Sequence, residues 1–277
     1  MRQHIQSIKL IALDMDGTLL MSDKTVHPDT IRAIEEAAHR GISVAYCTGR
    51  AVPELASYVD ILSAMRLGVC LAGALVYDFH DKRVIYKRSL NPVNVRSIIE
   101  TSVKYDAMAQ FLTADRSIVR RDQEACMADF NIGEYQNLFD KITAKVDDLS
   151  AEVRRSDAIL KANVHFRTVE DRQAAYEELK RLRMTPVFSE TSTLEIMPEG
   201  VSKASGLSML ARCLGIPMLN VMAIGDGNND RDMLKAVGFS VAMGNAWDDM
   251  KTDCDAVTED NDHNGVGIAI RRYTEKN

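Results

Sequence analysis

The chain lacks the cysteine spacing that would mark a zinc site or a disulfide framework. Its 277 residues include five cysteines, an odd number, and no two of them form a C-x-x-C pair. The cysteines are Cys47, Cys70, Cys126, Cys213 and Cys254. Most of them have apolar neighbours in the sequence, so we expect small buried hydrophobic residues rather than metal ligands.

The chain also lacks a long hydrophobic run and an excess of positive charge. Its longest nearly uncharged stretch, residues 67–77, is too short to span a bilayer. The first residues lack the apolar segment and cleavage site of a secretory signal. The net charge of −6 argues against nonspecific nucleic-acid binding, which depends on Lys and Arg at phosphates. We therefore expect a cytoplasmic protein with neither a membrane nor a nucleic acid as partner.

Two parts of the chain, residues 1–83 and 199–277, alternate apolar strands with helices. In the first part, strands are expected at residues 8–13 and 42–47, with a helix between them and another at residues 53–65. Strand and helix alternating at this spacing predict an α/β core, in which helices cover the faces of a parallel sheet.

The middle of the chain, residues 84–198, has a different pattern. Helices expected at residues 92–105 and 168–182 are separated by candidate strands at residues 158–166 and 193–197. The strands come in adjacent pairs, which favours an antiparallel sheet with helices packed on it. We interpret this segment as a second α/β domain inserted into the first.

Polar, reactive sequence follows three apolar strands of the expected core. Asp14-Met15-Asp16-Gly17-Thr18 follows the first, Thr48-Gly49-Arg50 the second, and Gly225-Asp226-Gly227-Asn228-Asn229-Asp230 a third. Lys203 lies at the start of the helix after the inserted domain. Ligands of open parallel sheets bind where strands end, so we expect these four segments to meet.

The residue types in these segments suit a metal ion. Carboxylates are costly to bury unless they are paired, hydrogen-bonded or bound to a metal. Asp14, Asp16 and Asp226 offer hard oxygen ligands of the kind that Mg²⁺ prefers. The sequence therefore predicts a Mg²⁺ site at the ends of these strands.

The same segments suit a dianionic phosphate. Lys203 brings a compact positive charge, and Thr48 and the amide of Gly49 bring hydrogen bonds. Asp14, ionised beside Mg²⁺ and Lys203, could attack phosphorus. Asp16 could protonate the leaving oxygen and then deprotonate the water that hydrolyses the aspartyl-phosphate.

These segments resemble the signature motifs of the haloacid dehalogenase (HAD) superfamily. Residues 14–18 match its DxDGT motif, residues 48–50 resemble the second motif, Lys203 the third and residues 225–230 the fourth. The stretches that resemble the Cof-type, class IIB branch in particular are residues 200–203, 241–246 and 264–266.

The resemblance implies a Rossmann-like core, residues 1–83 and 199–277, with an inserted α/β cap, residues 84–198, that selects the substrate. It implies a Mg²⁺-dependent phosphatase that hydrolyses small phosphorylated metabolites, such as sugar phosphates, through an aspartyl-phosphate. In this family pattern Asp14 is the nucleophile and Asp16 the acid and base.

The resemblance also implies a ligand set. The metal would be held by Asp14, Asp226 and the backbone carbonyl of Asp16, which replaces the side-chain ligand considered above. Asn229 would help to hold the phosphate. The residues implied to orient the site without touching the metal or the phosphate are Thr18 and Asp230.

Some positions depart from the pattern or have an open role. Ala72-Gly73-Ala74 stands where Cof-type chains usually carry Asn-Gly-Ala, so an amide near the substrate entrance is missing. Arg50 could contact the substrate or brace its loop. Arg116, Arg120 and Arg167 of the inserted domain could contact an anionic substrate or could be ordinary surface arginines.

Two other functions stay open from the sequence. A phosphomutase would use the same Asp14 and Asp16 but return the phosphoryl group to a sugar rather than to water. A noncatalytic phosphate-binding protein could share the fold, although pure binding has no need for Asp16. We expect a monomer or a small homo-oligomer.

Overall fold

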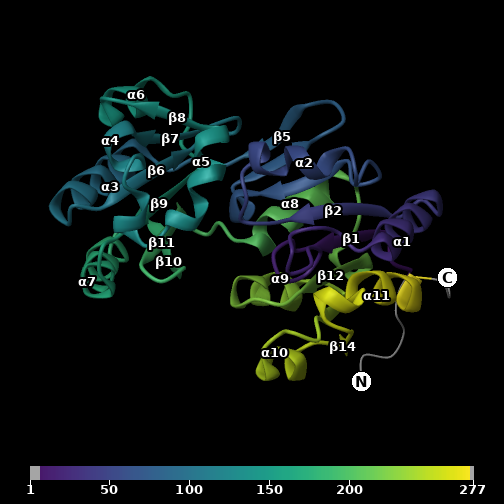
Figure 1. Ribbon diagram of the computed structural model, residues 1–277. Coiled ribbons are helices and arrows are strands. Elements are labelled where there is room, and N and C mark those ends of the chain that lie inside the picture. Colours follow the sequence, from purple (N-terminus) through teal and green to yellow (C-terminus); the bar gives the residue numbers. More distant parts are fainter. Residues whose placement is uncertain (1–6, 275–277) are drawn as a thin grey trace. The chain divides into compact units, whose positions relative to one another are not determined.

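The computed structural model describes residues 7–274, which divide into two compact units (Figure 1). The core unit comprises residues up to 49, residues 56–86 and those from 202 onward, and the inserted unit comprises residues 50–55 and 87–201. Each unit contains its own sheet with helices, so the predicted α/β class is confirmed. Within residues 7–274, no helix is both long and apolar enough to cross a membrane.

The core unit is built on an eight-stranded sheet with the order β14-β13-β12-β1-β2-β3-β4-β5. The six strands from β14 to β3 pair in parallel, as predicted, whereas β4 pairs antiparallel with β3. The strands are β1 (Leu10–Leu13), β2 (Ser43–Cys47), β3 (Leu67–Cys70), β4 (Leu75–Asp78), β5 (Arg83–Lys87), β12 (Val221–Gly225), β13 (Phe239–Ala242) and β14 (Ala256–Val257). Because β12, β1 and β2 are parallel neighbours, the residues that follow them emerge at one edge of the sheet.

Helices cover this sheet because alternate strand residues need apolar partners. Leu10 and Ala12 of β1 share one apolar cluster with Leu207 of α8, Met233 of α9 and Met250 of α10. The helices of the core unit are α1 (Pro28–His39), α2 (Ala56–Val59), α8 (Lys203–Cys213), α9 (Arg231–Ala236), α10 (Asp248–Asp253) and α11 (Gly265–Thr274). Helix α11 packs against α1, so the last described helix lies beside the first (Figure 1).

Two sequence-based expectations were wrong. The helix expected at residues 53–65 is only a short 3₁₀ turn followed by the four-residue α2. Leu62 and Met65 lie beyond the end of α2 and are buried. The spacing of these apolar residues therefore reflects their burial and not a helix. Of the five cysteines only Cys47 and Cys70 are buried, while Cys213 is exposed and the other two are intermediate. Cys213 is the last residue of α8 and lies outside the group of α8 side chains, Leu207, Leu210 and Ala211, that pack in the apolar cluster of the core unit.

The inserted unit contains a six-stranded sheet with the order β10-β11-β9-β6-β7-β8. Its neighbouring strands are antiparallel, as expected, except for the parallel pair β7 and β8. The strands are β6 (Met108–Leu112), β7 (Ser117–Arg120), β8 (Thr143–Val146), β9 (Lys161–His165), β10 (Met184–Ser189) and β11 (Thr193–Pro198). The predicted insert, residues 84–198, differs from this unit by a few residues at each end and does not include residues 50–55.

The two faces of this second sheet have different neighbours. Phe111 and Val164 point to one face, where they pack with residues of α3, α6 and α7. On the opposite face, Met108 and Val119 pack with an apolar cluster that includes Phe130. The helices of the inserted unit are α3 (Pro92–Lys104), α4 (Arg121–Glu124), α5 (Gln136–Ile142), α6 (Leu149–Arg155) and α7 (Val169–Leu179).

A pair of glycine substitutions tests how closely α8 packs on the core. Gly73 has φ +105°, and a Cβ there would lie 2.0 Å from the carbonyl oxygen of Ser202, just before α8. Gly41 has φ +79° with nothing within 4 Å of its Cβ position. We expect Gly41→Ala to lower the free energy of unfolding by about 1 kcal/mol through backbone strain alone. Gly73→Ala should cost about 3 kcal/mol or more, because a steric clash adds to that strain.

Urea unfolding of both variants and the parent protein measures this difference. Equal losses for the two variants would contradict the close approach of the backbone to α8.

Candidate active site

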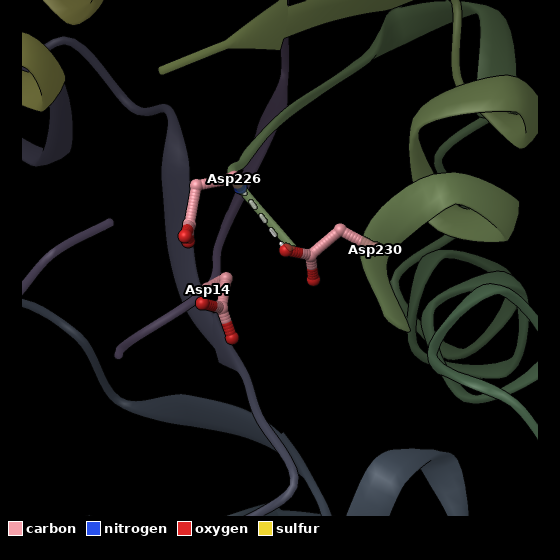
Figure 2. Close-up of side chains that lie close together, drawn as sticks. All are labelled: Asp14, Asp226 and Asp230. Atoms are coloured by element: carbon pink, nitrogen blue, oxygen red, sulfur yellow. Dashed lines mark hydrogen bonds between the residues drawn. The ribbon is translucent and has the colours of Figure 1, made fainter. Parts of the chain in front are cut away.

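Three carboxylates from two segments of the core unit meet at the edge where β1 and β12 end (Figure 2). Asp14 follows β1, Asp226 follows β12, and Asp230 ends the 3₁₀ turn Asn228–Asp230 before α9. Each offers one oxygen, and these three oxygens lie within 4.8 Å of one another. The structure thus brings together residues that are more than 200 positions apart in the chain.

The Lys203 side chain lies between two of these carboxylates. Its Nζ donates to Asp14 Oδ1 at 2.5 Å and to Asp230 Oδ1 at 2.7 Å. All three residues are buried, with Lys203 only 2% exposed. Ser202 caps α8, which fixes the start of the helix and with it the position of Lys203. Burial of one charge alone would cost several kcal/mol, so the pairing is what makes this burial possible.

Both carboxylate oxygens of Asp230 have partners. Oδ1 accepts from Lys203, and Oδ2 accepts from the backbone N–H groups of Asp226 at 3.1 Å and Gly227 at 3.0 Å. This carboxylate therefore fixes both the lysine and the turn that carries Asp226. Asp14 and Asp226 are the better placed pair for a divalent cation.

The loop after β1 contacts the carboxylate of Asp226 through Gly17 and Thr18. Thr18 Oγ1 donates to Asp226 Oδ1 at 2.7 Å, and Thr18 is itself buried. Gly17 has φ +79°, and a Cβ there would lie 2.4 Å from Asp226 Oδ2. Only glycine combines this backbone conformation with room for the carboxylate. The -Gly-Thr- pair of the motif is thus explained by contacts with an aspartate on another strand.

The Asp16 side chain does not join the buried cluster. It is 46% exposed, and its Oδ1 accepts from Lys24 Nζ at 2.9 Å. Lys24 has φ +65° in a turn where Tyr58 donates its hydroxyl to the Lys24 carbonyl oxygen. The exposed position leaves this carboxylate accessible for proton transfer, and a role as metal ligand would fall to the Asp16 backbone carbonyl.

The second motif is fixed through its backbone. Thr48 is buried, its N–H donates to the Val69 carbonyl at 2.8 Å, and its carbonyl accepts from Ala72 N at 3.0 Å. Gly49 ends this stretch of the core unit, and Arg50 belongs to the inserted unit. The remaining candidate phosphate ligand of the core unit, Asn229, is exposed in the turn before α9.

The departure at Ala72 has a backbone consequence. Ala72 is buried with φ 53° and ψ 28°, the left-handed region that asparagine tolerates better than alanine. The asparagine usual in Cof-type chains would therefore suit the turn geometry as well as offer an amide.

Burial and like charges shift the titration of the cluster. Burial and the nearby Asp230 raise the pKa of Asp14 to about 8, against the opposing effect of Lys203. Burial raises the pKa of Asp226 to about 6. Burial would lower the pKa of Lys203, but Asp14 and Asp230 outweigh it, so the lysine pKa is raised and the ammonium stays charged. An Asp14 that is ionised at neutral pH, as expected from the sequence, thus needs positive charge in addition to that of Lys203.

Sequence reasoning missed two asparagines that hold the loop after β1. Asn245 Nδ2 donates to the Gly17 carbonyl at 2.8 Å and lies 3.5 Å from Asp226 Oδ2. Asn261 Nδ2 donates to the Leu20 carbonyl at 3.0 Å. Asn245 lies in the stretch 241–246 that resembles the Cof-type branch, and that resemblance was the only signal of its importance.

The three arginines considered in the inserted unit all form ion pairs. Arg116 pairs with Glu152 at 3.0 Å, and Arg120 pairs with Asp122 at 2.6 Å. Arg167 pairs with two aspartates at 3.0 Å each, Asp106 and Asp129. All three are partly exposed, which agrees with surface arginines.

Comparison with known proteins agrees with this architecture. A family model described as haloacid dehalogenase-like hydrolase matches residues 11–270. The 5-amino-6-(5-phospho-D-ribitylamino)uracil phosphatase YcsE of Bacillus subtilis is 28% identical over 267 residues, 96% of each chain. A haloacid dehalogenase-like hydrolase from Bacteroides thetaiotaomicron has a structure that superposes with a TM-score of 0.85 at 25% identity, covering 96% of this chain and 99% of that one.

One further relative is matched over only part of its length. The chloroplastic endoribonuclease YBEY of Arabidopsis thaliana is 30% identical over 286 residues, which cover 99% of this chain but 48% of the plant protein. The chain thus spans about half the length of that relative.

A parallel α/β core with acidic loops at its strand ends and an α/β insert defines a class of hydrolase. The chain belongs to the haloacid dehalogenase-like hydrolases. Within that family it is a phosphatase of the Cof-type group.

The raised pKa values predict that binding of a divalent cation releases protons. The cation-free site holds protons on Asp14 and Asp226 below about pH 6, and a cation must displace them. Affinity for Mg²⁺ should therefore rise from about pH 5.5 to about pH 8. Calorimetric titrations in buffers of different ionisation enthalpy measure the protons released. An affinity that stays constant over this range, with no proton release, would show that these carboxylates do not bind the cation.

Proposed function

We propose that the protein is a Mg²⁺-dependent phosphatase that hydrolyses small phosphorylated metabolites through an aspartyl-phosphate. The observation that carries this proposal is the buried Lys203 ammonium held between Asp14 and Asp230, with Asp226 beside them. Such a site offers a carboxylate, a fixed positive charge and oxygen ligands for a cation within one small volume. Phosphoryl transfer requires mainly positioning and charge stabilisation, which these groups supply.

The donor set fits Mg²⁺, which is bound by few carboxylates and keeps several waters. The proposed ligands are Asp14, Asp226 and the backbone carbonyl of Asp16. When bound, Mg²⁺ supplies positive charge that offsets the charge on the transferring phosphoryl group.

Asp14 is the proposed nucleophile and Asp16 the proposed acid and base. An oxygen of Asp14 bonds to phosphorus while the bond from phosphorus to the leaving oxygen breaks, and Asp16 protonates that oxygen. Asp16 then takes a proton from water, whose oxygen attacks phosphorus and releases Asp14 and inorganic phosphate. The exposure of Asp16 suits a group that must exchange protons with leaving group and water.

Four residues are proposed to hold the phosphate oxygens: Thr48, Gly49, Lys203 and Asn229. Lys203 supplies the charge, and its two carboxylate contacts fix its position before the phosphate arrives. Asp230 positions Lys203, and Thr18 positions Asp226, without either touching the substrate. Arg50 is proposed as a further substrate contact.

The names of the relatives support small phosphorylated metabolites as substrates. One relative is named for a phosphorylated ribitylaminouracil. Another, from Serratia proteamaculans, is an HMP-PP phosphatase that is 31% identical over 255 residues, 88% of this chain and 86% of that protein. We propose sugar phosphates or similar metabolites. The expected cytoplasmic location and the monomeric or small oligomeric state remain predictions.

Asp14→Asn is expected to lower kcat at least about a thousandfold, because an amide cannot form the aspartyl-phosphate. The fold should persist, because asparagine has the size of aspartate and its Oδ1 can still accept from Lys203 Nζ. Phosphate release is measured over a panel of phosphorylated metabolites, with and without Mg²⁺, alongside thermal unfolding.

Asp60→Asn, at an exposed aspartate of the same unit, is the matched control and should keep parental activity. Substantial phosphate release by a clean preparation of Asp14→Asn would remove Asp14 as nucleophile. Transfer of phosphate between sugars without net release would instead identify a phosphomutase.

A further inference from the structure

The loop between β1 and α1 contains a tight turn that carries Lys24. Met21 donates its N–H to the Thr25 carbonyl oxygen at 2.9 Å. The N–H of Lys24 donates back to the Met21 carbonyl oxygen, also at 2.9 Å, which closes the turn. We call residues 21–25 the Lys24 turn. The chain reverses direction there within a few residues of Asp16, so the Lys24 side chain can return toward that carboxylate.

Contacts from distant parts of the core unit fix the Lys24 turn. Ser22 donates its N–H to Asp262 Oδ1 at 2.8 Å and its hydroxyl to Asp262 Oδ2 at 2.6 Å. The Tyr58 hydroxyl donates to the Lys24 carbonyl oxygen at 3.1 Å. These partners lie 240 and 34 positions away in the sequence. The backbone of the turn is therefore held from two sides, independently of the Lys24 side chain.

The backbone of Lys24 is strained. Its φ of +65° lies in the left-handed region, which glycine and asparagine adopt at lower cost than lysine. The Lys24 side chain is 61% exposed, so burial does not offset this strain. An exposed ion pair such as that of Lys24 with Asp16 contributes little to stability. Stability alone therefore does not account for a lysine at this position, and strain of this kind points to a functional role.

The turn directs the Lys24 ammonium to the carboxylate proposed as acid and base. Lys24 Nζ donates to Asp16 Oδ1 at 2.9 Å, and the Asp16 side chain is 46% exposed. An exposed carboxylate samples several side-chain conformations, and a charged hydrogen bond from a residue of fixed backbone restricts that sampling. Asp14 is held in the same way by Lys203. Each of the two aspartates after β1 is therefore held by a lysine of its own.

We propose that Lys24 is a positioning residue, which holds the Asp16 carboxyl group in place for proton transfer to the leaving oxygen. The proposal rests on the phosphatase function proposed above. As Asp14 bonds to phosphorus and the bond to the leaving oxygen breaks, the proton moves from Asp16 to that oxygen, and Lys24 transfers none. A carboxyl group that is already ordered loses less freedom in the transition state, so the contact with Lys24 lowers the barrier to this step.

The test compares substrates whose leaving groups differ in their need for a proton. An alkoxide needs one, whereas p-nitrophenolate is a weak base that leaves without one. The alkyl substrate is whichever of glucose 6-phosphate, ribose 5-phosphate and glycerol 3-phosphate the parent protein hydrolyses with the highest kcat/KM. This ratio reports the formation of the aspartyl-phosphate, the step in which the leaving oxygen departs. Lys24→Met should lower kcat/KM about tenfold or more for the alkyl phosphate and less than about twofold for p-nitrophenyl phosphate.

Two further variants at the same position separate positioning from a structural role. Lys24→Arg keeps a positive charge within reach of Asp16, so its kcat/KM for the alkyl phosphate should lie within about threefold of the parent value. Lys24→Gly relieves the strained backbone, so it should show the selective loss of Lys24→Met with a Tm equal to or above that of the parent protein. A lysine that only stabilised the turn would instead lose activity and stability together.

Lys82→Met is the matched control and should leave kcat/KM unchanged for both substrates. Lys82 also has a positive φ, 50°, in an exposed turn, but that turn follows β4 at the edge of the sheet where β3 begins, opposite the site. Equal losses on both substrates, no loss on either, or a Lys24→Arg variant no more active than Lys24→Met would overturn the proposal. Asp16→Asn should show the same selectivity with a larger loss. A nonselective Asp16→Asn, or a parent protein that releases phosphate from none of these substrates with Mg²⁺, would instead count against the proposed function.

Discussion

The contact of one buried ammonium with two carboxylates is the constraint on which the core unit depends. Lys203 contacts Asp14 and Asp230, and each of the three would be costly to bury without the others. Asp230 in turn binds the backbone at Asp226, and Asp226 binds Thr18 in the loop after β1. The ends of β1 and β12 and the start of α8 are thus joined through charged side chains.

Connectivity explains why the insert lies where it does in the chain. The core sheet is interrupted after β5, and the chain resumes the core at residue 202, next to Lys203. Strand β11 of the inserted unit ends at Pro198, and Lys203 is the second residue of the core unit after the connection that follows this strand. The capping of α8 by Ser202 and the close approach of Gly73 to that residue fix the point where the chain returns to the core unit, and with it the position of Lys203.

The sequence predicted the parallel core and the meeting of its acidic loops because both follow from local patterns. Apolar strands followed by aspartates need no knowledge of distant contacts, and parallel pairing then places their ends at one edge. The neighbouring polar side chains on one face of the inserted sheet could not be predicted in this way. Gln110, Asn163 and Glu195 come from three strands far apart in sequence, and only the strand register places them side by side. Asn245 and Asn261 were missed because each donates mainly to a backbone carbonyl of the loop after β1, and such a contact leaves no pattern in the sequence.

The charges of the site indicate the order in which it is filled. Three carboxylates against one ammonium leave two negative charges when all are ionised, and this excess would repel a dianionic phosphate. Burial, together with this repulsion, raises the pKa values of Asp14 and Asp226, so both carboxylates hold their protons more tightly. In the function proposed here, a divalent cation held by Asp14 and Asp226 would remove this excess, and Asp14 would then lose its proton. The proposed function therefore predicts that the cation binds before the phosphate.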